Sequence, residues 1–276
     1  MIIGIAGLGL IGGSIAKAYK TGGHDVYGFD TDEAVLGFAR LSEAINGILD
    51  EQSISTCDAL FIAVNPSDTT AYLENAAPYI AKNALVIDCC GVKRSICEKC
   101  FPVAQKHGFV FVGGHPMAGS HNAGFKNSHA DMFRGASIIL VPPVYDDPAL
   151  FGRIEDVLKP MGFGHLTVST AEKHDALIAF SSQMAHVVSN AYIKSPAAKN
   201  HKGFSAGSYK DLTRVARLDA DMWAQLCMNN NDNLIRELDS FIGEIKRYRD
   251  ALAAQDMKYL ITLLEEGSRL KKELDY

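Results

Sequence analysis

The sequence predicts an α/β protein with a second, all-helical part, and three observations support this prediction. A glycine-rich turn near the N-terminus lies between a short apolar run and a helical pattern. Short apolar runs then alternate with helical patterns, which is typical of βαβ units in a mostly parallel sheet. After about Ser169 only helical periodicity remains, so we expect one domain over residues 1–169 and another over residues 170–276.

The first predicted element is a buried parallel strand over residues 2–6, which leads into a GxGxxG turn and then a helix. In this pattern Gly7 allows a tight turn, Gly9 lets the backbone approach a pyrophosphate, and Gly12 permits close packing of helix on strand. The helix N-terminus offers unpaired N–H groups to the diphosphate. The turn therefore predicts a dinucleotide site.

The next apolar stretch ends on Asp30, where a carboxylate accepts hydrogen bonds from ribose hydroxyls and favours NAD over NADP. Residues 1–169 are thus predicted to be a Rossmann-type NAD-binding domain. The residues predicted to contact NAD are Gly7, Leu8, Gly9, Leu10, Ile11, Gly12, Asp30, Val64, Asn65 and Gly91. One alternative is a glycine-rich turn in another α/β protein. A signal peptide is disfavoured, because no positive region precedes the apolar run and four glycines interrupt its centre.

Composition limits the class of protein. A chain of 276 residues has room for one large or two ordinary domains, and 47% hydrophobic with 21% charged residues is typical of a soluble globular protein. A net charge of −5 gives no basic surface for nucleic acid. Neither a membrane span nor a targeting segment is evident, so we expect no membrane partner and a cytoplasmic location.

Six cysteines raise the question of a metal or redox site, because Cys97 and Cys100 have CxxC spacing and Cys89 and Cys90 lie just upstream. Cys89 and Cys90 end an apolar strand pattern, where cysteine behaves as a small buried hydrophobe. The sequence has no second CxxC and no histidine pair at zinc-finger spacing. We expect free thiols and no metal.

Further strands are predicted over residues 26–29, 59–64, 84–88, 109–113, 137–141 and 166–168. Ligands of parallel sheets bind beyond the carboxyl ends of the strands. Residues 65–66, 90–93 and 114–116 each follow a strand directly, so they are expected to line one crevice together with the cofactor. The direction of the strand at 137–141 stays open.

The C-terminal part is predicted to be helical, with Thr170 as the N-cap of its first helix and a loop near Pro196 and residues 203–207. Two later segments carry apolar residues at helical spacing, at Ile235, Leu238, Phe241, Ile242, Ile245 and Tyr248, and at Leu260, Leu263, Leu264 and Leu270.

Polar residues that could carry chemistry form three patches. His115 lies between glycine and proline at a strand end, and a near-neutral imidazole suits proton transfer that accompanies hydride transfer. On an α-helix, Asp175, Ser182 and His186 would form one polar stripe, facing a ligand or else solvent. Arg214 offers a planar fork for a carboxylate, with surface ion pairing to Asp211 as the alternative.

The glycine turn with its strand-end Asp, GVK after a strand, GxHPMAG, HD…H on a helix and KDLTRVA…MW together resemble motifs of the prephenate dehydrogenase family. The resemblance covers nearly the whole chain. It implies NAD-dependent oxidative decarboxylation of prephenate to 4-hydroxyphenylpyruvate in tyrosine biosynthesis, by a homodimer that pairs through its helical domains. Arogenate or dual cyclohexadienyl dehydrogenase is the alternative, and a catalytically silent NAD-binding dimer is a less favoured one. A dehydrogenase of 3-hydroxy acids is disfavoured, because Lys173 and Lys194 lack the motif of that group's lysine.

The resemblance also implies residue roles. His115 corresponds to the catalytic group that hydrogen-bonds the C4 hydroxyl of the substrate and takes up its proton. His186 corresponds to a substrate-positioning histidine and Arg214 to a carboxylate-binding arginine. The remaining predicted substrate contacts are Ser120, His121, Asp175, Gln183, Lys210 and Asp211.

Three positions depart from the family pattern. Gly91 stands where the family commonly has a serine that bonds the catalytic histidine, so Cys90, a water or another arrangement must hold His115. His121 replaces a common glutamate, which bears on the choice between prephenate and arogenate. Gln183 stands where another histidine is frequent. Neither a chorismate mutase nor a regulatory ACT domain is expected in this chain.

Overall fold

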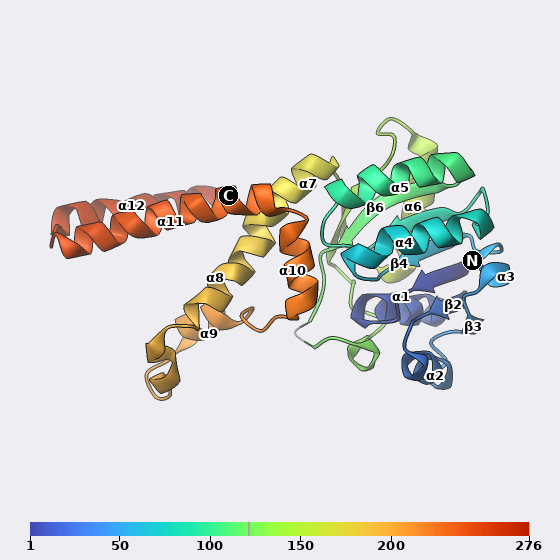
Figure 1. Cartoon of the computed structure of the whole chain (residues 1–276), viewed down its shortest axis with the longest axis horizontal. Helices are drawn as coiled ribbons and strands as arrows, with labels where there is room; N and C mark the ends of the chain where they lie inside the picture. Colours follow the sequence, from blue (N-terminus) through green and yellow to red (C-terminus); the bar gives the residue numbers. More distant parts are fainter. Residues whose placement is uncertain (121, 276) are drawn as a thin grey trace.

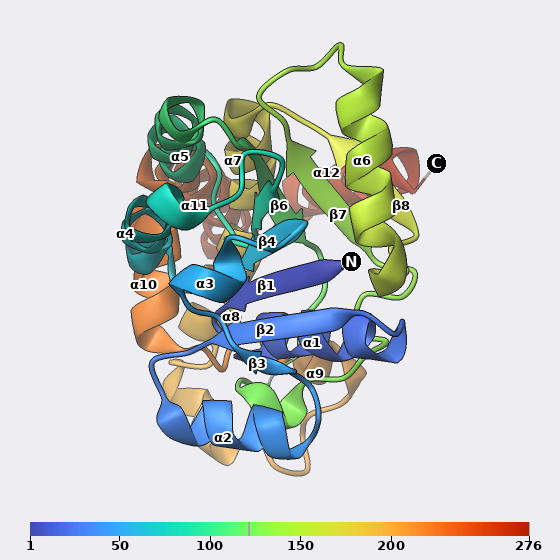
Figure 2. The same ribbon diagram turned by 90° about the vertical axis from the view of Figure 1, so that its right-hand side faces the viewer.

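The computed structural model describes residues 1–120 and 122–275. Its N-terminal part is an eight-stranded sheet with helices on both faces, and its C-terminal part is helical (Figures 1 and 2). The strand order is β3-β2-β1-β4-β5-β6-β7-β8. The strands are β1 (Ile2–Ala6), β2 (Asp25–Phe29), β3 (Gly47–Ile48), β4 (Ala59–Ile62), β5 (Leu85–Asp88), β6 (Val110–Pro116), β7 (Ser137–Val141) and β8 (His165–Val168).

All pairings from β3 to β6 are parallel, and the strand order turns back between β1 and β4. This is the switch point at which doubly wound sheets bind dinucleotides. The predicted α/β fold with a Rossmann-type N-terminal part and a helical C-terminal part is therefore confirmed.

Helices cover both faces of the sheet, as Figure 2 shows. One apolar core joins the sheet to α1 (Leu10–Thr21) and α6 (Pro148–Leu158). The other joins the opposite face to α4 (Pro66–Ala76) and α5 (Arg94–His107). Strand residues alternate between the two cores, since β4 sends Phe61 into the first and Leu60 into the second. Two short helices, α2 (Glu33–Leu41) and α3 (Glu51–Ile54), complete this part.

The C-terminal part is a string of helices that leads away from the sheet and ends in a long antiparallel pair (Figure 1). Its α- and π-helices are α7 (Ala171–Ile178), a π-helix (Ala179–Met184), α8 (Ala185–Tyr192), α9 (Gly207–Thr213), α10 (Ala220–Met228), α11 (Asn231–Ala253) and α12 (Met257–Leu274), and a 3₁₀-helix (Pro196–Asn200) lies between α8 and α9. Thr170 caps α7 as predicted, because its hydroxyl accepts a hydrogen bond from the N–H of Lys173 at 3.2 Å. None of the helices in the described part of the chain has both the length and the apolar content needed to cross a bilayer.

Three features of the fold differ from what the sequence predicts. The two-residue edge strand β3 was not predicted. His115 does not follow its strand but lies within it, because β7 runs antiparallel to β6 and pairs Ile139 with His115. Residues 173–192 do not form one α-helix, because the π-helix interrupts them, and its wider i→i+5 turn rotates the following residues out of line. The predicted single stripe of Asp175, Ser182 and His186 is therefore wrong.

Candidate active site

The glycine turn has the geometry that a dinucleotide site requires. Gly7 has a φ of +85°, and a Cβ there would lie 2.4 Å from the carbonyl oxygen of Ala63. A Cβ on Gly12 would lie 1.8 Å from the carbonyl oxygen of Gly7, so only glycine lets α1 pack this closely on β1. Gly9, the N-cap of α1, faces open space, and no described side chain caps the helix. The first-turn N–H groups are thus available to an anion.

Asp30 lies beside this turn. One carboxylate oxygen accepts a hydrogen bond from the N–H of Leu8 at 2.7 Å, and the other accepts from the N–H of Asp32 at 3.0 Å. Each carboxylate oxygen can accept a second hydrogen bond, so ribose hydroxyls can still be bound. Val64 packs against Gly7, and Asn65 is the N-cap of α4. Glycine turn, carboxylate and open helix N-terminus together fit NAD.

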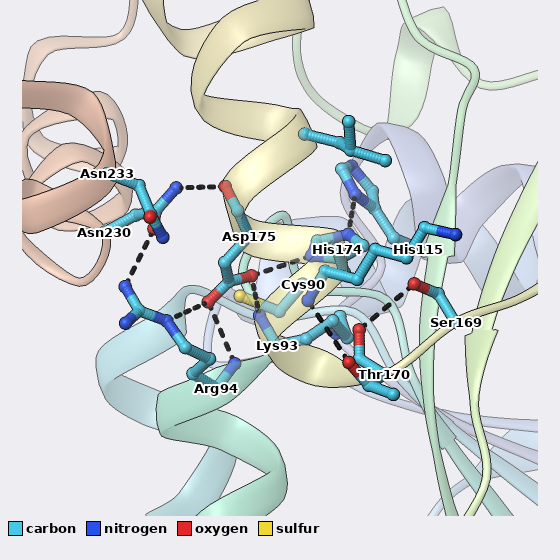
Figure 3. A network of polar contacts seen from close by, with 12 residues as sticks. Cys90, Lys93, Arg94, His115, Ser169, Thr170, His174, Asp175, Asn230 and Asn233 are labelled. Atoms are coloured by element: carbon cyan, nitrogen blue, oxygen red, sulfur yellow. Dashed lines mark hydrogen bonds and ion pairs between the residues drawn. The ribbon is translucent and has the colours of Figure 1, made fainter. Parts of the chain in front are cut away.

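His115 is the first member of a chain of three polar side chains that runs from β6 to α7 (Figure 3). Its Nδ1 lies 2.8 Å from Nε2 of His174, and Nδ1 of His174 lies 2.7 Å from Oδ1 of Asp175. The side chains of His174 and Asp175 are fully buried, whereas His115 is partly exposed. Of these three side chains, only that of His115 therefore reaches the crevice.

Asp175 belongs to α7, and its carboxylate lies at the N-terminus of α5. Its two oxygens accept hydrogen bonds from the backbone N–H of Lys93 at 2.7 Å and of Arg94 at 3.0 Å. Burial opposes ionisation, but the hydrogen bonds from His174, Arg94 and Lys93 outweigh it and lower the pKa of Asp175. This carboxyl group is therefore ionised at neutral pH.

Both histidines are neutral at pH 7. Burial, the repulsion that a protonated His174 would exert and the charge of Lys93 hold the pKa of His115 well below its ordinary value. Burial also lowers the pKa of His174, although its hydrogen bond to Asp175 works in the other direction. A neutral imidazole can accept a proton, as the predicted role of His115 requires.

A buried ion pair supports the strand that carries His115. Nζ of Lys93 pairs with Asp88, and both side chains are fully buried. Asp88 also accepts hydrogen bonds from the N–H of Gly114 at 3.0 Å and of Cys90 at 2.9 Å. The pair therefore ties the end of β5 to the residue before His115.

Gly91 and α10 close over the other side of the His115 ring. A Cβ on Gly91 would lie 3.8 Å from Nε2 of His115 and 3.1 Å from Cδ2 of Leu226. Gln225 on the same helix accepts a hydrogen bond from the N–H of Ser67 at 3.2 Å. The helical part thus lies across the carboxyl ends of the strands, where the crevice was predicted.

His186 on α8 lies against Trp223 on α10, with ring centroids 4.0 Å apart, and its Nδ1 is 2.9 Å from the carbonyl oxygen of Ser182. Gln183 is buried. Its amide donates to the carbonyl of Leu226 at 3.0 Å and accepts from Asn230 at 2.8 Å. Both polar atoms of this amide are hydrogen-bonded inside the helical part, so Gln183 holds α10 and Asn230 in place and does not face the crevice.

The segment that carries Arg214 packs on α8. Ser189 donates to the carbonyl of Leu212 at 2.7 Å, and Asn190 donates to the carbonyl of Ala216 at 2.9 Å. Three predicted site residues of this segment, Lys210, Asp211 and Arg214, are exposed. Among the described residues, no ion pair joins Asp211 to Arg214, so the pairing weighed as an alternative is not formed.

Ser120 is exposed, and its hydroxyl bonds the backbone of Asn122. His121 lies outside the described residues. No group of His, Cys, Asp and Glu in the described ranges is arranged to hold a metal ion, and the six cysteines are unpaired. The site residue that sequence analysis missed is His174, although it directly precedes Asp175 in the HD pair.

The chain matches two models of one family. The prephenate dehydrogenase nucleotide-binding domain matches residues 15–166, and the prephenate dehydrogenase dimerization domain matches residues 170–266. The chain belongs to the prephenate dehydrogenase family. It is therefore an NAD-dependent dehydrogenase, and its helical part corresponds to the family's dimerization domain.

Two curated relatives are similar over most of their length. A cyclohexadienyl dehydrogenase of Zymomonas mobilis is 29% identical over 282 residues, which cover 99% of this chain and 95% of the relative. A prephenate dehydrogenase of Bacillus subtilis is 29% identical over 271 residues, which cover 93% of this chain and 71% of the relative.

Solved structures share the fold. Synechocystis arogenate dehydrogenase superposes with a TM-score of 0.80 at 24% identity, over 99% of this chain and 100% of that one. The prephenate dehydrogenase of A. aeolicus, solved with hydroxyphenyl propionate and NAD⁺, gives 0.83 at 22% identity, over 99% and 98% of the chains.

Proposed function

We propose that this enzyme catalyses the oxidative decarboxylation of prephenate to 4-hydroxyphenylpyruvate. The observation that carries the proposal is the location of His115. Its neutral imidazole lies on the side of the sheet where the parallel strands end, which is also the side of the glycine turn and Asp30. Family membership and the prephenate dehydrogenase of B. subtilis support this substrate.

The cofactor is proposed to bind along the turn from Gly7 to Gly12, with Asp30 at the ribose and with Val64, Asn65 and Gly91 beside it. Bound NAD supplies a hydride acceptor for the C4 carbon of the substrate. The formation of an aromatic ring drives the loss of CO₂, so that step needs no further catalytic group. The residues of the protein therefore have to orient the substrate and to accept and return one proton.

His115 is proposed to hold that proton. Its Nε2 accepts a hydrogen bond from the C4 hydroxyl and takes up the proton as the hydride departs. The ring carboxylate then leaves as CO₂, and its bonding electron pair completes the aromatic ring. The phenol of the product carries a proton, so His115 returns its proton to that oxygen and ends the cycle neutral.

Arg214 is proposed to bind a substrate carboxylate through its guanidinium fork, and His186 to position the ring beside Trp223. Ser120, Lys210 and Asp211 are exposed and can approach the substrate directly. For His121 a substrate contact stays a prediction.

Asp175 and Gln183 are proposed to act without touching the substrate, because their polar atoms are engaged inside the protein.

The domain division and the dimer are also proposals. A boundary at residues 169–170 is supported by the end of β8 at Val168 and the start of α7 at Ala171. A homodimer that pairs through the helical domains is supported by the family's dimerization domain and by exposed apolar side chains on α11 and α12. These side chains are Ile235, Ile242, Ile245, Ile261, Leu264 and Leu270.

A dual cyclohexadienyl dehydrogenase is the second candidate, favoured by the similarity to the Z. mobilis enzyme along nearly both chains. Initial rates of NADH formation with prephenate and with arogenate separate the candidates. We expect the larger kcat/KM with prephenate. Equal values indicate the dual enzyme, and turnover of arogenate alone or of neither substrate refutes the proposal.

A further inference from the structure

Beyond the catalytic role of His115, we propose that His174 and Asp175 are positioning residues that fix the tautomer of His115 and share the proton that it receives. The reaction to which this relay contributes is the one proposed above. The relay itself follows from hydrogen-bond geometry that exists without substrate or cofactor.

The direction of each hydrogen bond can be deduced from Asp175. This ionised carboxylate only accepts, so Nδ1 of His174 must carry a hydrogen and donate it across 2.7 Å. Neutral His174 then has a lone pair on Nε2. That atom accepts from Nδ1–H of His115 across 2.8 Å. Nε2 of His115 is left without a hydrogen, ready to accept one.

On the side of the ring that faces the substrate, no residue in the described ranges forms a hydrogen bond with Nε2 of His115 that would fix its tautomer. Residue 91 is glycine and offers no side chain, and the nearest group beyond it is the apolar end of Leu226. Without His174 the two neutral tautomers of His115 would be close in energy, and the tautomer with hydrogen on Nε2 cannot accept the hydroxyl proton. The tautomer of His115 is therefore set by the hydrogen bond between its Nδ1 and His174.

The anchor of the relay is itself held by both parts of the chain. Besides the two backbone N–H groups of α5, Nε of Arg94 lies 3.3 Å from Asp175. Arg94 also donates to Asp232 at 2.9 Å and to Asn230 at 3.0 Å, both at the start of α11 or just before it. Asn230 in turn donates to the carbonyl of Asp175 at 2.8 Å. These contacts leave the carboxylate little freedom to turn.

The relay also determines where the positive charge resides. When Nε2 of His115 takes the hydroxyl proton, the hydrogen on its Nδ1 moves to Nε2 of His174. His115 stays neutral, and His174 becomes an imidazolium beside the carboxylate of Asp175. The reverse shift returns the proton to the product oxygen, so no proton is gained or lost. Of the buried pair Lys93–Asp88, the charge of Lys93 lowers the pKa of both rings, whereas the charge of Asp88 raises only that of His174.

Two substitutions at one position test the relay. In His174→Asn the side-chain amide can still donate to Asp175 but is too short to reach His115. In His174→Gln the longer amide can accept from Nδ1 of His115 but cannot take up a proton. We expect His174→Asn to lower kcat about 10²-fold with KM within about two-fold, and His174→Gln to retain at least tenfold more kcat than His174→Asn.

The second readout needs neither substrate nor cofactor. In ¹⁵N spectra of histidine-labelled enzyme, the signals of His115 are those lost in His115→Asn. We expect hydrogen on Nδ1 in the wild type and in His174→Gln, and a mixture of tautomers in His174→Asn. His129→Asn is the matched control, since His129 also pairs with a carboxylate at 2.8 Å but is exposed. It should change neither readout.

The relay is refuted if wild-type His115 carries its hydrogen on Nε2, or if His174→Asn keeps both the tautomer and kcat within about two-fold. Equal losses of kcat in the two variants with an unchanged tautomer indicate a purely structural role and refute it as well. Circular dichroism and NAD affinity verify that each variant is folded. Failure of the wild type to oxidise prephenate would refute the proposed reaction but leave the tautomer measurement intact.

Discussion

Removing Lys93 should destabilise the protein far more than removing any exposed lysine, because its partner Asp88 would keep a buried negative charge. Both side chains have no exposed surface. Breaking such a pair from one side costs about 3–5 kcal/mol. In Lys93→Met the carboxylate still accepts from the N–H groups of Gly114 and Cys90, which offsets part of the loss. We therefore expect the lower end, about 3 kcal/mol.

Urea unfolding followed by circular dichroism measures this cost, at one fixed protein concentration because the proposed dimer would make stability depend on concentration. Lys99 lies on the same helix as the control, and Lys99→Met removes an exposed lysine, so it should change the free energy of unfolding by less than about 0.5 kcal/mol. In the double variant Lys93→Met/Asp88→Asn neither charge of this pair remains, so its loss should be smaller than the sum of the single losses by about 2 kcal/mol. A cost below about 1 kcal/mol for Lys93→Met, or strictly additive losses, would contradict the reasoning.

Four further outcomes are expected. His115→Asn should abolish turnover and leave NAD affinity, measured by fluorescence titration, within about two-fold; normal turnover would refute the assigned role. Because the pKa of His115 is lowered on folding, unfolded chains take up a proton first as the pH falls, so His115→Asn should also lose less stability than the wild type between about pH 7 and 5. Gly12→Ala should weaken NAD binding at least about tenfold, since its Cβ would displace α1 from the Gly7 carbonyl. Asp30→Ser should lower the affinity for NAD about tenfold but not that for NADP, and equal losses would argue against ribose recognition by Asp30.

Local patterns sufficed to predict most of the nucleotide-binding part. The strand over residues 137–141 matches β7, because one short apolar run is enough to define a buried strand. Its direction was not predictable, and that direction keeps His115 inside a ladder instead of in a loop. The edge strand β3 has only two residues, too few for any periodic pattern.

In the helical part, periodicity predicted helices but not their local geometry. The π-helix at Ala179–Met184 has no distinctive composition, yet it decides that Gln183 turns inward and His186 meets Trp223. The bonds that join His115 to His174 and Asp175 to Lys93 link residues 59 and 82 positions apart. Such pairings depend on how the domains pack, which no single segment encodes.

This packing also explains why a helical domain belongs to the active site at all. The nucleotide-binding part supplies His115 and the N-terminus of α5, but the carboxylate that those N–H groups hold comes from α7. A domain that bound only NAD would lack His174 and Asp175, so nothing would select one tautomer of His115 and no histidine–carboxylate pair would take up the added proton. Because Arg94 joins Asp175 to Asp232 on α11, the elements that orient the base extend into the long helix pair. Competence for proton transfer is therefore a property of the two parts together, whereas the glycine turn and Asp30 lie wholly within the first.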